Sequence, residues 1–276
     1  MITQERQQIQ NDWDNIAVGY DTFVTSTHMR LADDGLHRAG LSSGMRFLDV
    51  ACGSGALSIP AARIGASVLS VDTSPVMLER LKLRAKEEGL NLETRVMDGQ
   101  ALELKDNSFD ITGSQFGVML FPDMPAGLRE MARVTKAGGR VLMHALGHPQ
   151  EVEFFDFFVK AIQSVVPTFA PPMDPPPLPF QLRNPEKFRQ EMVKAGLKDV
   201  SVETVIETLS FESGKQFWQW LVNSNPVAGR ILGELNLTEH QIDSIQESLN
   251  FMIRKRAAGN NLAVLTNQIH RGLGKK

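Results

Sequence analysis

Short apolar runs and amphipathic segments alternate along the middle of the chain. The apolar runs have the length and β-branched content of buried strands, and the segments between them repeat apolar residues at helical spacing. The predicted strands are residues 45–50, 66–72, 92–97, 108–114 and 139–146, and the predicted helices are residues 4–18, 26–40, 56–65, 74–89 and 124–138. Strands that alternate with helices indicate βαβ units, in which a parallel sheet is covered on both faces.

Start and stop signals agree with these helices. Ser74 precedes a proline, which is tolerated in the first turn of a helix, so a helix is expected to begin there. Gly89 and the pair Gly138-Gly139 are the predicted ends of two helices.

Beyond residue 150 the alternation is lost. The predicted elements there are helices over residues 151–166, 184–197 and 214–257, with a capping box at Thr238 and Gln241, and strands over residues 200–211 and 261–270. Residues 167–180 contain too many prolines for a helix or a central strand, which predicts an extended surface loop. The pattern therefore predicts a doubly wound α/β domain with helical insertions late in the sequence.

Composition excludes several classes of protein. A chain of 276 residues with 42% hydrophobic content can bury a full core, and a net charge of −3 offers no basic face for nucleic acid. One cysteine excludes an internal disulfide and a thiolate-rich zinc site, and no metal is expected. The polar N-terminus lacks the apolar core of a signal peptide, and no apolar run approaches the roughly 20 residues that span a membrane. A soluble cytoplasmic protein is expected.

The stretch FLDVACGSGAL, residues 47–57, passes from a strand to a helix within one turn. Its Gly53 and Gly55 allow left-handed torsions and let a ligand touch the main chain. Asp72 ends the next strand, about 20 residues farther on, where a carboxylate can accept both hydroxyls of a ribose. Ligands of open parallel sheets bind beyond the carboxyl ends of the strands. These residues predict a site for a nucleoside-like ligand.

Two residues distinguish between the possible nucleosides. A nicotinamide dinucleotide fingerprint requires Gly or Ala where this chain has Ser58. The carboxylate of Asp49 would repel a pyrophosphate but would attract a cation. S-adenosylmethionine carries both an ammonium and a sulfonium group, so it is favoured over NAD.

Four successive motifs resemble those of the class I S-adenosylmethionine-dependent methyltransferases. They are FLDVACGSG, VLSVDTSPVMLERL, MDGQALELKDNSFD and LREMARVTKAGGRVL, within a match over residues 10–146. Within this family they look like enzymes of the ubiquinone/menaquinone-biosynthesis type and their small-molecule relatives. Ala51 departs from the family, which usually has the first glycine of the turn there. We expect the turn to survive, because alanine is small.

The resemblance implies a Rossmann-like, doubly wound, mostly parallel sheet of seven strands with the last strand antiparallel, and helical cap insertions. It implies the following segments: an N-terminal helical lid over residues 1–44, a cofactor-binding core over 45–150, a helix and proline-rich insertion over 151–183, a continuation of the core over 184–213, a helical cap over 214–258, and a final strand and tail over 259–276.

By the same resemblance, the first turn binds the methionine part of S-adenosylmethionine. Asp49 and the backbone of Ala51, Gly53 and Gly55 would hold that part. Asp72 would hold the ribose hydroxyls, although an acid at this place can also cap the helix that begins near residue 74.

The resemblance assigns the adenine ring to the end of the third strand. Asp98 would accept a hydrogen bond from the adenine amino group, and the backbone of Gly99 and Gln100 would meet the ring edge. Thr73 and Met77 would pack beside the ribose and the adenine. Taken alone, Asp98 could equally be a turn residue.

Tyr20 and Gln115 are assigned to the neighbourhood of the reacting sulfur. Tyr20 lies in AVGYD, which resembles the N-terminal lid of the family and would close over the sulfonium, or it anchors the first helix to the core. Gln115 follows the fourth strand and would face the methionine and the acceptor, or it bonds only to neighbouring loops.

A general base is needed only if the methyl acceptor loses a proton during transfer. His144, near the carboxyl end of the fifth strand, and His28, in the N-terminal segment, are the candidates, against the commoner reading of a structural histidine. Arg30 could meet the methionine carboxylate or lie on the surface. Cys52 has no acid-base partner in the sequence and is expected to be a small filler.

Aromatic residues in the late segments predict an apolar pocket for the acceptor, with ordinary core packing as the alternative. They are Phe154, Phe155, Phe157 and Phe158, with Trp218 and Trp220.

The predicted function is methyl transfer from S-adenosylmethionine to a small, apolar or aromatic acceptor. A non-catalytic S-adenosylmethionine binder and, with less support, an NAD-dependent oxidoreductase are the alternatives. Protein, RNA and DNA acceptors are disfavoured, because GSQFGVML after the fourth strand lacks the N-P-P-Y-type motif of amino-methylating enzymes. The sequence leaves the oligomeric state open, with a homodimer as one option.

Overall fold

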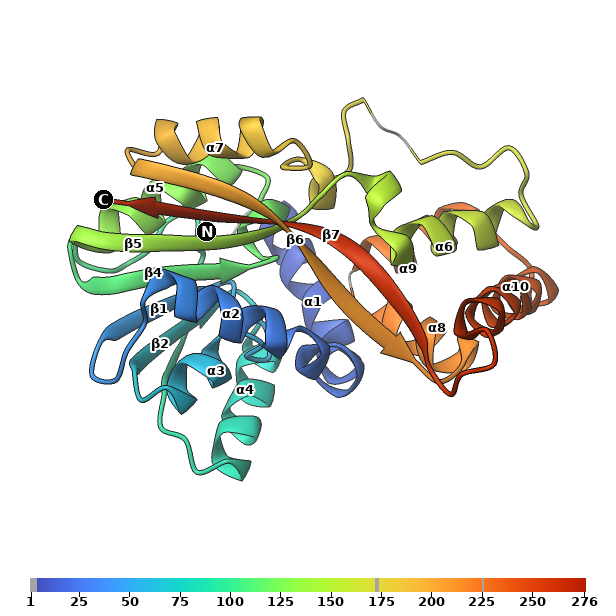
Figure 1. Ribbon diagram of the computed structural model, residues 1–276, viewed down its shortest axis with the longest axis horizontal. Helices are drawn as coiled ribbons and strands as arrows, with labels where there is room; N and C mark the ends of the chain where they lie inside the picture. The colour runs from blue at the N-terminus through green and yellow to red at the C-terminus, as the bar shows by residue number, and fades with distance from the viewer. Residues whose placement is uncertain (1–3, 172–173, 225) are drawn as a thin grey trace.

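A seven-stranded sheet organises the computed structural model, with the strand order β3-β2-β1-β4-β5-β7-β6 (Figure 1). The strands are β1 (Arg46–Val50), β2 (Ser67–Asp72), β3 (Glu93–Val96), β4 (Phe109–Gln115), β5 (Thr135–Leu146), β6 (Lys198–Phe211) and β7 (Ala263–Lys275). Strands β1 to β5 pair in parallel, whereas β7 runs antiparallel to both β5 and β6. The predicted fold class, including the antiparallel last strand, is confirmed.

The structure describes residues 4–171, 174–224 and 226–276. The parts of our predictions that fall on residues 1–3, on 172–173 in the proline-rich segment and on 225 in the late helical region lie outside the described residues. Over the described ranges, no helix combines the length and the apolar character that crossing a membrane requires.

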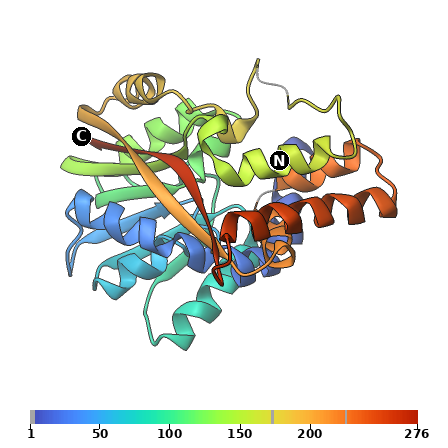
Figure 2. The same ribbon diagram turned by 45° about the vertical axis from the view of Figure 1, so that its right-hand side comes forward.

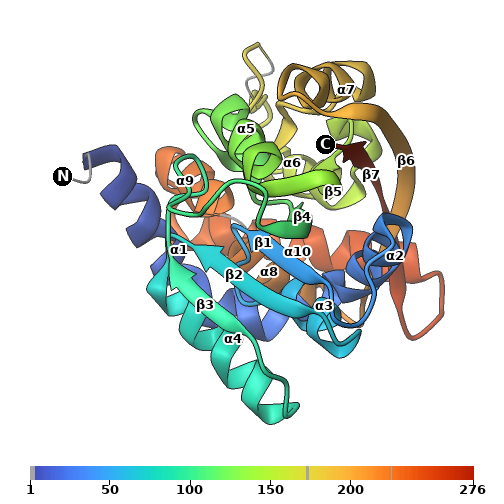
Figure 3. The same ribbon diagram turned by 90° about the vertical axis from the view of Figure 1, so that its left-hand side faces the viewer.

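Helices cover the two faces of the sheet and form a separate group at one end. They are α1 (Gln4–Phe23), α2 (Met29–Ala39), α3 (Ser58–Arg63), α4 (Pro75–Glu87), α5 (Met124–Val134), α6 (Glu153–Gln163), α7 (Pro185–Lys194), α8 (Gly214–Ser224), α9 (Pro226–Glu234) and α10 (Glu239–Ala257), with short 3-10 turns η1 (Thr25–His28), η2 (Val118–Leu120), η3 (Pro149–Glu151) and η4 (Leu178–Phe180). Helices α2, α3 and α4 pack on one face, and α5 and α7 on the other (Figure 3). Helices α6, α8, α9 and α10 gather at the end where β6 and β7 extend past the parallel strands (Figures 1 and 2).

Two predicted helix starts are confirmed by their hydrogen bonds. The Ser74 hydroxyl accepts a bond from the backbone N–H of Met77 at 3.0 Å, with proline at the first helical position of α4. Thr238 and Gln241 form the predicted capping box of α10. Such caps satisfy backbone donors that a helix leaves unpaired.

The prediction that the Gly138-Gly139 pair ends a helix is wrong. Helix α5 already ends at Val134, and β5 begins at Thr135, so both glycines lie within the strand. A Cβ at Gly139 would lie only 2.5 Å from the carbonyl oxygen of Asp110. The glycine therefore permits a close approach of β5 to β4, where the register of the two strands shifts.

The turn after β1 survives the replacement of the family's glycine by Ala51, as expected. Ala51 takes the left-handed conformation with φ of 54°, which costs an L-residue roughly 1–2 kcal/mol. Its Cβ faces Gly117, because a Cβ added at Gly117 would lie 2.5 Å from it and 2.9 Å from the Ala51 carbonyl oxygen. The Cβ of Ala51 fits because Gly117, which has no side chain, leaves space for it.

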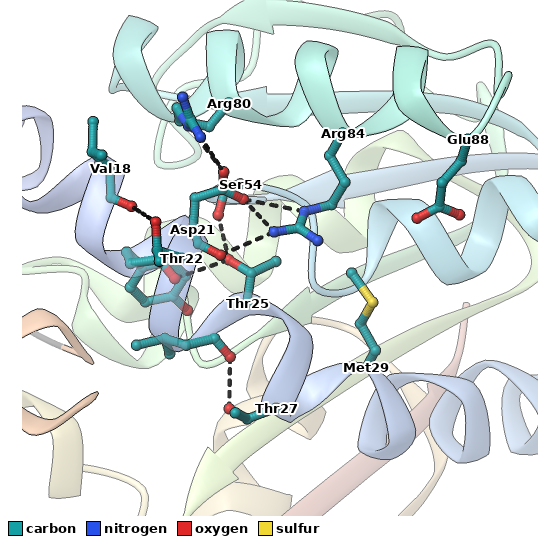
Figure 4. A network of polar contacts seen from close by, with 12 residues as sticks. Val18, Asp21, Thr22, Thr25, Thr27, Met29, Ser54, Arg80, Arg84 and Glu88 are labelled. Carbon is teal, nitrogen blue, oxygen red and sulfur yellow. Dashed lines mark hydrogen bonds and ion pairs between the residues drawn. The ribbon is translucent and has the colours of Figure 1, made fainter. Parts of the chain in front are cut away.

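Asp21 fixes the C-terminal part of α1 on α4 (Figure 4). Its Oδ2 lies 2.8 Å from Arg80 Nη2, its Oδ1 accepts from Arg84 Nη2 at 2.5 Å, and Arg84 also donates to the Asp21 carbonyl oxygen at 2.9 Å. Nearby, the hydroxyls of Thr25 and Ser54 share a hydrogen bond that ties η1 to the turn after β1 (Figure 4). These bonds hold α1 beside the carboxyl ends of the strands.

Replacement of Asp21 by alanine is expected to lower the free energy of unfolding by about 2 kcal/mol, because charge-assisted bonds at a buried carboxylate are lost and two cations remain. Hydrogen exchange of the α1 amides should also accelerate. Urea denaturation provides the measurement. Lys82→Ala is the matched control on the same helix, since Lys82 makes an exposed ion pair with Glu79. Equal effects of the two substitutions would show that the ion pairs of Asp21 with Arg80 and Arg84 do not hold α1 on α4.

A double-mutant cycle tests the Ala51–Gly117 contact. Gly117→Ala alone should destabilise the protein by about 1–3 kcal/mol through overpacking. In an Ala51→Gly background the same substitution should cost at least about 0.5 kcal/mol less, because the Cβ in its way is gone. The same loss in both backgrounds, measured by urea denaturation, would show that the two residues do not interact.

Candidate active site

The carboxyl ends of β1, β2 and β4 open into a cavity of about 350 Å³, which we call the polar cavity. Ten of the twelve predicted cofactor-binding residues line it: Tyr20, Asp49, Ala51, Gly53, Asp72, Thr73, Met77, Asp98, Gln100 and Gln115. Gly55 and Gly99 do not. A Cβ at Gly55 would lie 2.4 Å from Leu81, and a Cβ at Gly99 would lie 2.7 Å from Phe121, so both glycines serve close packing behind the lining residues.

Asp49 presents a buried carboxylate to the polar cavity. Its Oδ2 accepts a hydrogen bond from Ser58 Oγ at 2.5 Å, and the Ser58 and Ser70 hydroxyls lie 2.7 Å apart. Its Oδ1 has no hydrogen-bond partner in the described part of the chain. Burial raises the pKa of Asp49 to about 7. An oxygen left without a donor at a cavity wall suits a ligand that brings a positive charge or an N–H group.

Asp72 connects the glycine turn to the start of α4. Its Oδ2 accepts from the backbone N–H of Gly53 and its Oδ1 from that of Ser74, both at 2.9 Å. Burial raises the pKa of Asp72 above its ordinary value. Asp72 therefore does stabilise the start of α4, the alternative role that the sequence suggested for it. The backbone N–H of Thr73 also stabilises this carboxylate. The bonds from Gly53 and Ser74 occupy one lone pair of each oxygen, so acceptor capacity remains for ribose hydroxyls.

Asp98 is engaged at both oxygens. Its Oδ1 accepts from the backbone N–H of Gln100 at 2.8 Å and from Gln100 Nε2 at 3.1 Å. Its Oδ2 lies 3.1 Å from Arg6 Nη2 on α1, an ion-pair distance, but has no hydrogen-bond partner in the described part of the chain. The N-terminal helix thus reaches across the predicted adenine end of the polar cavity, and a ligand there shares Asp98 with Arg6.

A second cavity of about 470 Å³, which we call the apolar cavity, lies against the first. Trp13, Tyr20, Phe116 and Leu120 line both cavities. Of the predicted aromatic lining, Phe154, Phe155, Phe158 and Trp220 line the apolar cavity, and residues 175–180 close it on the proline-rich side. Phe157 and Trp218 instead pack in the core of the helical group.

Phe116 was missed by the sequence analysis, although it follows Gln115 directly. It is in the left-handed conformation, with φ of 60°, which is an outlier for a bulky residue. Such strain gathers at functional sites, and here it directs the backbone so that one ring lines both cavities. The only available signal was its place after the fourth predicted strand.

Gln115 and His144 form a hydrogen-bonded pair behind the polar cavity. Gln115 Nε2 donates to the His28 carbonyl oxygen at 3.0 Å, and its Oε1 lies 3.0 Å from His144 Nδ1. His144 Nε2 accepts from Arg271 Nε at 3.2 Å. Burial, with the nearby cation of Arg271, lowers the pKa of His144 to about 3. His144 is completely buried and lines neither cavity, so the geometry argues against it as a proton acceptor.

The remaining candidates are placed as follows. His28 lines the apolar cavity and lies 2.7 Å, through Nδ1, from Glu207 Oε1. Arg30 is exposed on α2 and lines neither cavity, which agrees with the surface reading. Cys52 is buried in the wall of the polar cavity, where burial raises the pKa of its thiol, consistent with a filler. Within the described ranges, no three His, Cys, Asp or Glu side chains are grouped to hold a metal ion.

Comparison with known sequences gives the following similarities. Residues 48–143 match a family model described as a methyltransferase domain. An uncharacterized protein of Mycobacterium tuberculosis is 45% identical over 103 residues, which are 37% of this chain and 38% of that protein. A demethylmenaquinone methyltransferase of Corynebacterium efficiens is 32% identical over 164 residues, covering 57% of this chain and 68% of that enzyme. The match therefore spans well under half of the mycobacterial relatives but two thirds of the corynebacterial one.

Solved structures agree in fold. The YcgJ protein of Bacillus subtilis superposes with a TM-score of 0.54 at 17% identity, over 90% of this chain and 97% of that one. Phosphoethanolamine N-methyltransferase 2 of Haemonchus contortus, solved with S-adenosyl-L-methionine, gives a TM-score of 0.54 at 21% identity, over 89% of this chain and 52% of that one. Together with the extent of the corynebacterial match, the strand order and the carboxylates at the strand ends, we conclude that this chain belongs to the class I S-adenosylmethionine-dependent methyltransferases and resembles their ubiquinone/menaquinone-biosynthesis type.

Proposed function

We propose that this chain transfers a methyl group from S-adenosylmethionine to a small acceptor with an apolar or aromatic body. The observation that carries the proposal is the shared wall between the two cavities. Carboxylates line the polar cavity, aromatic side chains line the apolar one, and Tyr20 and Phe116 line both. A donor and an acceptor bound in these two spaces would meet at that wall.

The residues of the polar cavity fit S-adenosylmethionine. The partnerless Oδ1 of Asp49 suits the ammonium or the sulfonium, and the free lone pairs of Asp72 suit the ribose hydroxyls. Asp98 and Gln100 would contact the edge of the adenine, and Thr73 and Met77 would pack beside the ribose and the adenine. The same acidic lining disfavours the pyrophosphate of NAD.

When bound, S-adenosylmethionine supplies a methyl group that is already activated as part of a sulfonium. The chain's own contribution is then alignment and exclusion of water. Asp49 and Asp72 would fix the donor at the floor of the polar cavity. Tyr20 would lie over the donor from α1, since a Cβ added at Gly53 would lie 3.7 Å from the Tyr20 ring. The same ring lies edge-on to Trp13, with ring centroids 6.0 Å apart. The acceptor would be held by the aromatic rings of the apolar cavity.

A non-catalytic binder of S-adenosylmethionine is the alternative from another class. It accounts for the polar cavity but assigns nothing to the apolar one. Because the corynebacterial relatives are named demethylmenaquinone methyltransferases, quinols belong in any panel of trial acceptors.

The first test is uptake and transfer of label from methyl-labelled S-adenosylmethionine, with phenols, quinols, amines and thiols as acceptors. Asp72→Ala should weaken donor binding by about 10- to 100-fold in calorimetry, since hydrogen bonds to a charged group are each worth roughly 1.5–3 kcal/mol. Glu87→Ala, an exposed acid on α4, is the matched control and should bind normally. Circular dichroism verifies that both variants are folded. Binding of the donor without label in any acceptor would favour the non-catalytic reading.

The affinity for S-adenosylmethionine is expected to fall as the pH drops below about 7. Asp49, with a pKa of about 7, is an anion above that pH and attracts the cationic donor, whereas its protonated form below that pH does not. The effect should be smaller for S-adenosylhomocysteine, whose sulfur is uncharged. Asp72 also has a raised pKa, so Asp49→Asn is needed to assign the effect. Calorimetry from pH 6 to 8 in which Asp49→Asn keeps the full pH dependence would exclude Asp49 as its source.

A further inference from the structure

A buried histidine–glutamate pair lies beside the apolar cavity, which His28 lines and Glu207 does not. His28 Nδ1 is 2.7 Å from Oε1 of Glu207 on β6, and each residue is only 6% exposed. The rings of Phe116 and Trp220 lie edge-on to the imidazole, with centroids 5.0 and 6.0 Å away. Taking a carboxylate out of water into such apolar surroundings costs several kcal/mol unless it is compensated. The pair therefore calls for an explanation beyond packing.

The hydrogen bond fixes the protonation pattern of the neutral imidazole. An ionised Glu207 can only accept, so Nδ1 carries the proton and Nε2 keeps its lone pair. Nε2 makes no hydrogen bond to any residue within the described ranges, and His28 lines the apolar cavity. The Gln115 amide holds the His28 backbone in place through the carbonyl oxygen at 3.0 Å.

His144 provides the contrast within the same molecule. Both of its ring nitrogens are engaged, by Gln115 and by Arg271, and it lines neither cavity. His28 is thus the histidine with an available lone pair at the place where an acceptor would bind.

We propose that His28, oriented by Glu207, accepts the proton of an aromatic hydroxyl, and that the methyl acceptor is a neutral phenol or quinol. This inference rests on the proposed methyl transfer. The hydroxyl oxygen forms the new bond to the methyl carbon, the electron pair of the carbon–sulfur bond returns to sulfur, and the hydroxyl proton passes to His28 Nε2. The Glu207 carboxylate stabilises the resulting imidazolium, which later releases its proton to water.

The lining of the apolar cavity favours a neutral hydroxyl over a cationic amine. Apart from His28 and Tyr20, the ionisable residues among its described lining are Arg230 and Glu234, which have opposite charges. The rest of that lining is almost entirely aromatic, aliphatic or proline. A protonated amine would leave its hydration shell for a wall with little to replace it, whereas a phenol buries an aromatic body and needs one hydrogen-bond acceptor.

The test compares His28→Gln and Glu207→Gln with Glu203→Gln, a half-exposed acid four residues earlier on β6 that lines neither cavity. Calorimetry with S-adenosylmethionine and label transfer to a series of phenols of decreasing pKa are measured for each. For weakly acidic phenols, His28→Gln should lower kcat by roughly 100-fold or more, Glu207→Gln by a smaller factor, and Glu203→Gln not at all. Donor affinity should stay within twofold of the unmodified chain.

A structural role for the pair predicts a different pattern. If His28 only supports the fold, its loss lowers kcat equally for all phenols. If it accepts the proton, the deficit shrinks for acidic phenols such as 4-nitrophenol, which ionise without a base. Should His28→Gln fail to fold, the same series on Glu207→Gln decides the matter.

The outcomes also separate the inference from the proposed function. No uptake of S-adenosylmethionine by the unmodified chain, or uptake with no labelled product, overturns the methyl transfer itself. Methyl transfer that goes to amines or thiols but not to phenols, or that is unchanged in both variants, overturns the role of the His28–Glu207 pair alone.

Discussion

The carboxylate of Asp72 connects the two parts of the chain on which the polar cavity depends. One oxygen holds the backbone of the glycine turn after β1, and the other holds the first turn of α4. The glycine turn also places Ala51 against Gly117, which follows β4, so the ends of β1, β2 and β4 are fixed relative to one another. Because these bonds use only part of each acceptor's capacity, the same atoms that build the turn still present lone pairs to a ligand.

The second half of the chain contributes a space of opposite character. Helices α6, α8 and α9 and the proline-rich segment supply mainly aromatic, aliphatic and proline side chains. The ends of the parallel strands supply carboxylates. The ring of Phe116 lines both spaces, and the backbone of Phe116 adopts a strained left-handed conformation at this position. The late helices and the proline-rich segment therefore form much of the wall of the apolar cavity.

Much of the polar cavity could be predicted from the sequence, because its residues lie in short local motifs at predicted strand ends. Asp49, Asp72 and Asp98 are of this kind. The His28–Glu207 pair could not be predicted, since its members are 179 positions apart and meet only through the tertiary packing of η1 and β6. The Gly138-Gly139 pair was misread for a related reason. Glycine marks both helix ends and close strand approaches, and only the neighbouring strand decides between them.

The first helix is fastened unequally along its length. Near its C-terminus Asp21 is buried between two arginines, whereas toward the N-terminus the ion pairs of Arg6 with Asp98 and of Asp12 with Arg230 involve half-exposed arginines. Exposed pairs of that kind contribute roughly 0–1 kcal/mol each and are screened by salt. A rise in ionic strength should therefore weaken the attachment of the N-terminal part of α1 and leave the part held by Asp21 in place.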